Sequence, residues 1–264
     1  MGRIVAVANQ KGGVGKTTTA INLAAALAAA GQRVLLVDLD PQSNLTSGVG
    51  SKGKAGPGGT VYHALITETP ASDPSPFIIP TVVDRLMLIP ADRQLTGAEI
   101  ELVPLSRREE RLRSLITSVR DQYDYVFIDC PPSLGLLTLN ALVAADAVLI
   151  PLHCEYFALE GLADLVGTMR RVRASLNPSL DIEGVLLTMN DDRNNLGQQV
   201  SRDVREFFKD KVYRTVIPRN VRLAEAPSHG LPAVTYDARS RGAEAYFAFA
   251  REVLERNEPA LAGQ

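Results

Sequence analysis

Short apolar runs alternate with longer amphipathic segments along the chain, and each run has the length of a single strand. Strands are expected at Ile4–Ala8, Arg33–Asp38, Leu86–Ile89, Tyr125–Asp129, Ala147–Pro151, Glu183–Thr188 and Val212–Ile217. Helical patterns occupy Lys16–Ala30, Gly97–Val103, Arg107–Asp121, Leu136–Ala144, Ala158–Leu176, Leu196–Lys209 and Ala243–Arg256. This alternation predicts an α/β fold with a mostly parallel, doubly wound sheet and helices on both faces.

Three segments depart from this rhythm. Residues Gly48–Gly59 are rich in glycine and are expected to form a mobile surface loop, while Thr69–Pro80 carries four prolines and is expected to be irregular. The tail 257–264 is expected to fray. No linker separates two regions of different composition, so the prediction is one domain over residues 1–264.

The composition is that of an ordinary globular protein, with 45% hydrophobic residues. No apolar run approaches the ~20 residues that span a bilayer, and no signal peptide is recognisable, so a cytoplasmic location is expected. Two cysteines do not make a disulfide framework, and three isolated histidines make a metal cluster improbable.

The segment Lys11-Gly12-Gly13-Val14-Gly15-Lys16-Thr17-Thr18 follows a predicted strand and opens a predicted helix. Glycines allow backbone N–H groups to surround phosphate oxygens, and the helix N-terminus adds its positive dipole end. Lys16 supplies a cation for the β and γ phosphates, and the Thr17 hydroxyl is placed for Mg²⁺. A tight strand-to-helix turn alone does not explain a lysine at the helix start, where the dipole disfavours it.

Carboxylates follow two further predicted strands. Asp38 and Asp40 end the run that starts at Arg33, and Asp129 ends the run that starts at Tyr125. Because the carboxyl ends of parallel strands line the ligand crevice, these groups are expected near the phosphate loop. Asp129 is expected to reach Mg²⁺ through water, since Mg²⁺ keeps several of its waters.

The loop has Gln10 where the standard GxxxxGK pattern has glycine, and Lys11 follows it. In this it resembles the deviant form, KGGxxK followed by Ser or Thr, of the MinD/ParA group of P-loop ATPases. Longer segments resemble the chromosomal ParA (Soj) family over nearly the whole chain. These are Asn9–Lys11, Asp38–Gln42, Pro131–Leu134, Asn140–Leu142, Pro151–Leu152, Tyr156–Leu162 and, most specifically, Ile217–Gly230. Ser43 departs from the family, which often has glycine there.

The resemblance implies a P-loop NTPase-like fold and a weak basal ATPase that cycles between monomer and ATP-bound homodimer. It implies that Lys11 reaches the partner subunit's phosphates, that Asp40 positions the attacking water, and that Asp38 supports the Mg²⁺ shell or the switch loop. It places Pro218 and Asn220 near the adenine, with Asn190 a weaker candidate. It further implies non-specific binding to double-stranded DNA at the nucleoid and stimulation by a ParB (Spo0J) partner.

The net charge of −2 does not suggest a nucleic-acid binder by itself. Between Asn190 and Arg241, however, ten Lys/Arg face seven Asp/Glu, and Lys211–Leu223 holds four basic residues and no acid. A small basic stripe, doubled by dimerisation, is enough for phosphate contacts. Arg193 and Arg219 align with arginines implicated in DNA binding by similar proteins. Arg222 is a third candidate, with an ordinary surface ion pair as the equal alternative.

Other function classes stay open. A MinD-like membrane-cycling ATPase would need a C-terminal amphipathic helix with a basic face, whereas acidic residues interrupt the segment here. An Fe–S carrier of the nitrogenase iron-protein type would need thiolates at a dimer axis, and Cys130 and Cys154 show no CxxC spacing. A ligase or kinase acting on a small molecule would need a second-substrate site, which the sequence does not display.

Overall fold

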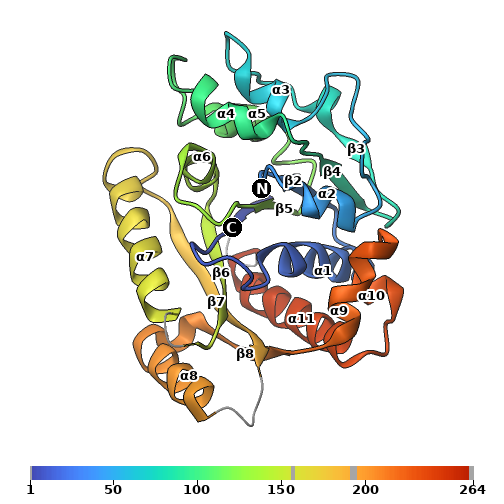
Figure 1. Ribbon diagram of the computed structural model, residues 1–264, viewed down its shortest axis with the longest axis vertical. Coiled ribbons are helices and arrows are strands. Elements are labelled where there is room, and N and C mark those ends of the chain that lie inside the picture. Colours follow the sequence, from blue (N-terminus) through green and yellow to red (C-terminus); the bar gives the residue numbers. More distant parts are fainter. Residues whose placement is uncertain (1, 156–157, 191–194, 262–264) are drawn as a thin grey trace.

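The computed structural model describes residues 2–155, 158–190 and 195–261, and in this part of the chain a single eight-stranded sheet runs through the molecule (Figure 1). The strands are β1 (Arg3–Val7), β2 (Val34–Asp38), β3 (Ile79–Pro80), β4 (Leu86–Ile89), β5 (Tyr125–Asp129), β6 (Ala147–His153), β7 (Asp181–Asn190) and β8 (Val212–Pro218). Their order is β3-β4-β2-β5-β1-β6-β7-β8, and all neighbours are parallel except β3 and β4. The predicted doubly wound, mostly parallel fold is confirmed.

The helices lie between the strands in the chain and cover both sides of the sheet. They are α1 (Lys16–Ala29), α2 (Asn44–Gly48), α3 (Val61–Ile66), α4 (Leu95–Glu101), α5 (Arg111–Thr117), α6 (Leu136–Ala144), α7 (Ala158–Ser175), α8 (Asn195–Phe208), α9 (Val221–Glu225), α10 (Ala233–Tyr236) and α11 (Arg241–Leu261). Short 3₁₀ turns occupy Ser75–Phe77, Lys209–Lys211 and Ala226–His229.

The central strands are buried on both faces because each alternates its side chains between two separate cores. On β2, Val34 and Leu36 join the core under α1 and α11, whereas Leu35 and Val37 join the core under α5, α6 and α7. Figure 1 shows α1 and α11 side by side on the first of these faces. Parallel strands covered on both faces carry continuous apolar runs, which is why these strands were readable from the sequence.

All seven predicted strands are present, and the helix boundaries differ at several ends. The predicted helix Arg107–Asp121 is shorter and begins at Arg111, since Arg107 has a left-handed φ of 51° and residues 108–110 form turns. At its other end Val119 and Arg120 donate to carbonyls three residues back instead of four. The last helix continues past Arg256 to Leu261, beyond its predicted end.

The segment Thr69–Pro80, predicted to be irregular, contains one 3₁₀ turn and the short edge strand β3. The glycine-rich segment 48–59 is largely irregular, and its beginning is packed, since Ser51 is fully buried. Gly50 has a φ of 73° and lies against the backbone of Gly230, so a Cβ at position 50 would come within 2.9 Å of the Gly230 carbonyl oxygen. The mobility predicted for this loop stays a prediction.

Candidate functional site

The phosphate loop connects the carboxyl end of β1 to the first turn of α1, in the context that the motif requires. Gly13 and Gly15 have φ values of 73° and 87°, a left-handed conformation that side chains with a Cβ rarely adopt. The loop is fixed from β7, where the Thr188 hydroxyl donates to the Val14 carbonyl at 2.8 Å. Gly12 precedes these turns, and Thr17 and Thr18 lie in the first turn of α1.

Lys16 is buried, with 7% of its surface exposed, and its Nζ donates to the Lys11 carbonyl at 3.1 Å. The ammonium therefore folds back over its own loop, where phosphate oxygens are bound in P-loop sites. Burial lowers the pKa of Lys16, and the negative charge of Asp129 acts in the opposite direction. An anionic ligand in the loop would restore the charge balance that burial disturbs.

Asp129 ends β5 and lies in register with Val7 of β1 and Asp38 of β2. The carboxylate is completely buried, and neither oxygen accepts a hydrogen bond from the residues that the structure describes. Burial, followed by the charge of Asp38, raises the pKa of Asp129 well above its ordinary value, while the nearby Thr17 side chain acts to lower it. An orphaned buried carboxylate beside the phosphate loop fits a magnesium shell reached through water.

Asp38 is also fully buried, but its carboxylate is occupied. Oδ2 accepts hydrogen bonds from the Thr46 backbone N–H at 2.8 Å and the Thr46 hydroxyl at 2.6 Å, and Oδ1 accepts from the Asp40 N–H at 3.2 Å. Burial raises the pKa of Asp38 to about 6 despite these bonds. Asp38 therefore holds the loop between β2 and α2, a contact that was not among its two expected roles, and those roles stay predictions.

Asp40 lies just beyond β2, with 8% of its surface exposed. Its Oδ1 accepts from the Gln42 N–H at 2.9 Å, and its carbonyl accepts from the Ser43 N–H at 2.8 Å. Ser43 has a φ of 50°, the left-handed region that favours glycine. The conformation explains why glycine suits this position, and it leaves Asp40 on a tight turn beside the phosphate loop.

Lys11 occupies a different place from Lys16. Its side chain is 33% exposed and forms an ion pair with Glu155, which follows β6. The other oxygen of Glu155 lies 2.9 Å from Nδ1 of His153. The sequence reasoning missed Glu155 and His153, although both stand at the carboxyl end of a predicted strand, the edge where a parallel sheet binds its ligands.

The residues expected near the adenine lie at the carboxyl ends of β7 and β8. Pro218 is in register with Asn190, and the Arg219 N–H donates to the Asn190 carbonyl at 3.4 Å. Asn220 caps the N-terminus of α9, where its side-chain oxygen accepts from the Arg222 N–H at 2.9 Å. Pro218 and Asn220 therefore share the edge of the sheet that holds the phosphate loop.

The predicted basic stripe Lys211–Leu223 is divided by β8, whose seven residues span roughly 20 Å at the usual rise per residue. Lys211 pairs with Asp181 at 3.0 Å, and Arg214 pairs with Glu255 at 2.8 Å, both away from the nucleotide edge. Beyond the carboxyl end of β8, Arg222 pairs with Glu225 at 2.7 Å and Asp237 at 3.2 Å. The four basic residues of the predicted stripe are therefore separated along β8, and DNA binding by them stays a prediction.

Arg219 differs from these neighbours, because its guanidinium makes no ion pair with a carboxylate among the described residues. Burial lowers the pKa of His153, and the charges of Lys11 and Arg219 lower it further. The hydrogen bond from Lys11 lowers the pKa of Glu155, and the charge of Arg219 adds a smaller effect in the same direction. Arg193 lies outside the described residues. Arg219 is therefore the predicted DNA-contacting arginine that the structure places at the nucleotide edge, with no salt bridge from the described part of the chain to compensate its charge.

The remaining alternatives can be compared with the structure. Cys130 and Cys154 are free and buried, and burial raises the pKa of Cys154 to about 11 and that of Cys130 further. No group of three or more His, Cys, Asp or Glu side chains suited to a metal ion occurs in the described ranges. No helix within them has both the length and the apolar character needed to cross a membrane.

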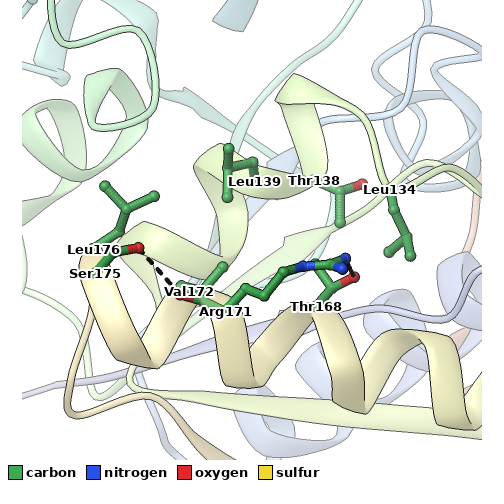
Figure 2. Close-up of a pocket in the computed structure, with 8 residues that line it drawn as sticks. All are labelled: Leu134, Thr138, Leu139, Thr168, Arg171, Val172, Ser175 and Leu176. Carbon is green, nitrogen blue, oxygen red and sulfur yellow. Dashed lines mark hydrogen bonds between the residues drawn. The ribbon is translucent and has the colours of Figure 1, made fainter.

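A cavity of about 290 Å³ lies between α6 and α7, and Figure 2 shows the side chains that line it. Leu134, from the Pro-Pro-Ser-Leu-Gly segment after Asp129, lines it together with Leu139 of α6 and Val172 of α7. On its rim Arg171 donates to the Thr168 hydroxyl at 2.9 Å. The segment that follows Asp129 thus extends from the carboxyl end of β5 to the cavity between α6 and α7.

Taken together, the parallel sheet, the glycine loop at the start of α1 and the buried carboxylate on the neighbouring strand define a P-loop nucleoside triphosphatase with two loop lysines. A family model described as an AAA domain matches residues 2–182. The sporulation initiation inhibitor protein Soj of Bacillus subtilis is 59% identical over 253 residues, covering 96% of this chain and 98% of that protein. The chromosome partitioning protein ParA of Myxococcus xanthus is 54% identical over 259 residues, covering 98% of this chain and 90% of that protein.

The chain belongs to the Soj/ParA family of chromosome-partitioning ATPases, as the resemblance in its motifs implied. It is an ATP hydrolase. Among solved structures, cobyrinic acid a,c-diamide synthase of Mycobacterium smegmatis with a bound ATP analog and magnesium matches with a TM-score of 0.82 at 37% identity, covering 98% of this chain and 96% of that one. ATP and Mg²⁺ are accordingly the cofactors of this site.

Proposed function

We propose that this protein is an ATP-dependent switch for chromosome or plasmid partitioning, which dimerises with ATP, binds double-stranded DNA without sequence preference and hydrolyses ATP when a ParB/Spo0J-type partner stimulates it. The names of its relatives support the partitioning role. The observation that carries the proposal is that the two loop lysines occupy different environments. Lys16 is buried over the loop, whereas Lys11 stands at the rim with a partly exposed side chain.

In the proposed mechanism the backbone N–H groups of residues 12–18 and the Lys16 ammonium bind the triphosphate. Mg²⁺ would be held by the Thr17 hydroxyl and, through water, by Asp129, and would neutralise charge on the phosphates. Asp38 holds Thr46 and the loop that carries Asp40. Asp40 then orients the attacking water from its tight turn.

Lys11 is assigned to the second protomer's phosphates. A cation that arrives in trans adds positive charge only when two ATP-bound subunits meet, which links hydrolysis to dimerisation. The same pairing would place two copies of Arg219 on one assembly. Because non-specific DNA binding grows with the number of neutralised phosphates, a dimer would hold DNA where a monomer of net charge −2 does not.

The alternative of a MinD-like membrane anchor finds little support in α11. Its apolar residues Tyr246, Phe249 and Val253 are buried in the core shared with α1 and β8. An amphipathic helix that inserts into lipid needs such a face exposed. Within the described side chains the apolar face of α11 is already used for packing.

The proposal is tested by DNA mobility shift with ATP, ADP and no nucleotide, each at about 50 mM and about 200 mM salt. The expected result is binding with ATP alone, to DNA of unrelated sequences, weakened by at least about tenfold at the higher salt. Binding that ignores nucleotide would contradict the switch. Binding to anionic vesicles but not DNA would favour the membrane-cycling class instead.

A further inference from the structure

The ion pair between Lys11 and Glu155 joins two segments that lie far apart in the sequence. Lys11 opens the phosphate loop after β1, and Glu155 follows β6, the strand next to β1 in the sheet. Glu155 also lies 2.9 Å from the His153 ring nitrogen, so the carboxylate is bound from two sides. The Lys11 ammonium, which the proposed mechanism needs in the partner subunit, is thus held within its own chain.

Hydrogen bonds from Asn9 hold the backbone next to this ion pair. Asn9 is buried at 3% exposure, its side-chain oxygen accepts from the Lys11 N–H at 3.0 Å, and its side-chain nitrogen donates to the Pro151 carbonyl at 2.8 Å. One asparagine therefore ties the start of the loop to β6. With both backbones held, the side chain of Lys11 is the part that can move.

The pair itself is weak enough to break. The side chains of Lys11 and Glu155 are 33% and 45% exposed, and ion pairs with such exposure are easily replaced by water or by a stronger partner. A triphosphate carries more negative charge than one carboxylate, so it competes well for the ammonium. After the Lys11 side chain moves away, the negative charge of Glu155 is still stabilised by solvent, by His153 and by the nearby charge of Arg219.

We propose that Glu155 is a positioning residue that holds the Lys11 ammonium in its own protomer until a second ATP-bound protomer offers phosphate oxygens. This inference rests on the proposed dimerising function. We call the Lys11–Glu155 ion pair the latch. It opposes dimerisation before ATP is bound, because each protomer must break this ion pair to form the ATP-bound dimer. Glu155 thereby sets the ATP and protein concentrations at which the dimer forms.

The test compares wild type with Glu155→Gln, which keeps the size and removes the charge, and with Glu160→Gln as a matched control on the exposed first turn of α7. Dimer formation is followed by analytical ultracentrifugation against ATP and protein concentration. The Lys11–Glu155 ion pair is expected to stabilise each separate protomer by about threefold. Glu155→Gln removes this stabilisation from both protomers, so its dimer should have a dissociation constant roughly tenfold lower than that of wild type. Glu160→Gln is expected to behave as wild type.

A double-mutant cycle separates positioning from a structural effect. The cycle is measured at saturating ATP and at protein concentrations high enough for Lys11→Ala to dimerise. In that background Glu155→Gln has no Lys11 charge to release, so it should leave the dimerisation constant unchanged. ATP binding to the monomer, measured at protein concentrations below dimerisation, should be the same in wild type and Glu155→Gln. Glu155→Asp keeps the negative charge, so its dimerisation constant should be closer to that of wild type than to that of Glu155→Gln.

The outcomes are distinguishable. If wild type fails to dimerise with ATP, the proposed function itself is wrong. If wild type dimerises and Glu155→Gln dimerises equally or less well, the latch is overturned, and weaker dimerisation would place Glu155 at the interface in trans. An equal effect of Glu155→Gln with and without Lys11 would also overturn it.

Discussion

Asp38 and Asp129 lie opposite each other in the register of the neighbouring parallel strands β2 and β5, and both carboxyl groups are fully buried. Burial raises the pKa of both carboxyl groups, and the charge of Asp38 raises the pKa of Asp129 further. Thr46 and Asp40 supply hydrogen bonds to Asp38, whereas Asp129 has none from the described residues. Ionised carboxylates are therefore unfavourable at this site in the absence of a cation, and a divalent cation would stabilise them.

Asp129→Asn should stabilise the nucleotide-free protein at pH 8. A carboxyl whose folded pKa is raised contributes stability below its unfolded pKa near ~4, and loses it as the pH rises through the folded value. Removing the charge should therefore raise the free energy of unfolding at pH 8 and raise it by less at pH 5. Urea denaturation at both pH values measures this, with the exposed Asp121→Asn as control.

The same variant should lose function, because an amide in place of the Asp129 carboxylate cannot hold the waters of Mg²⁺ in the same way. Thermal shift with MgATP is expected to be large for wild type and small for the variant. A gain in stability that is equal at pH 5 and pH 8 would show that charge burial is not the cause. A variant that keeps the full MgATP shift would contradict the assignment of Asp129 to the metal.

Asp40→Ala should retain ATP binding and lower phosphate release by about 100-fold, since it removes the group assigned to the attacking water. The ATP-bound dimer should then persist on DNA instead of dissociating with time. Phosphate release and the DNA-bound fraction, followed together after adding ATP, measure both effects. Asp84→Ala, whose side chain is 97% exposed, is the matched control. Normal hydrolysis by Asp40→Ala would exclude this role.

Arg219→Glu should weaken DNA binding at least about tenfold and leave ATP-dependent dimerisation intact. The reason is that no carboxylate of the described residues pairs with Arg219 at the nucleotide edge, so its reversal acts directly on phosphate contacts. Arg222→Glu and Arg214→Glu are the controls, because their guanidinium groups are already paired with carboxylates. Equal losses in all three would indicate a diffuse electrostatic effect, and loss of dimerisation in Arg219→Glu would indicate a structural arginine.

Ser43→Gly should raise the melting temperature by about 2 °C, because glycine adopts the φ of 50° without the steric cost that serine bears. The gain is limited by the greater freedom of glycine in the unfolded chain. Ser47→Gly, inside α2, is the control and should lower the melting temperature, since its backbone is helical. Scanning calorimetry without nucleotide compares the two, and a lower melting temperature for Ser43→Gly would refute the strain.

The sequence by itself determined the parallel sheet, the phosphate loop and the three carboxylates at strand ends. These features are local: buried parallel strands require continuous apolar runs, and a loop that wraps phosphate requires glycines with positive φ next to a helix start. Each of these features could therefore be predicted from its own segment, as for Gly13, Gly15, Lys16 and Asp129. Helix ends were less readable, as the early start predicted at Arg107 shows, because single left-handed residues decide them.

Only the tertiary structure decided which distant residues meet. The placement of β6 beside β1 brings Glu155 to Lys11, and the placement of β7 beyond it brings Thr188 to Val14. The length of β8 separates Lys211 from Arg219, although they are close in sequence. Strand order is set by packing over the whole sheet, so no local pattern encodes these pairings, and the charge balance around each arginine depends on the carboxylate that the fold places beside it.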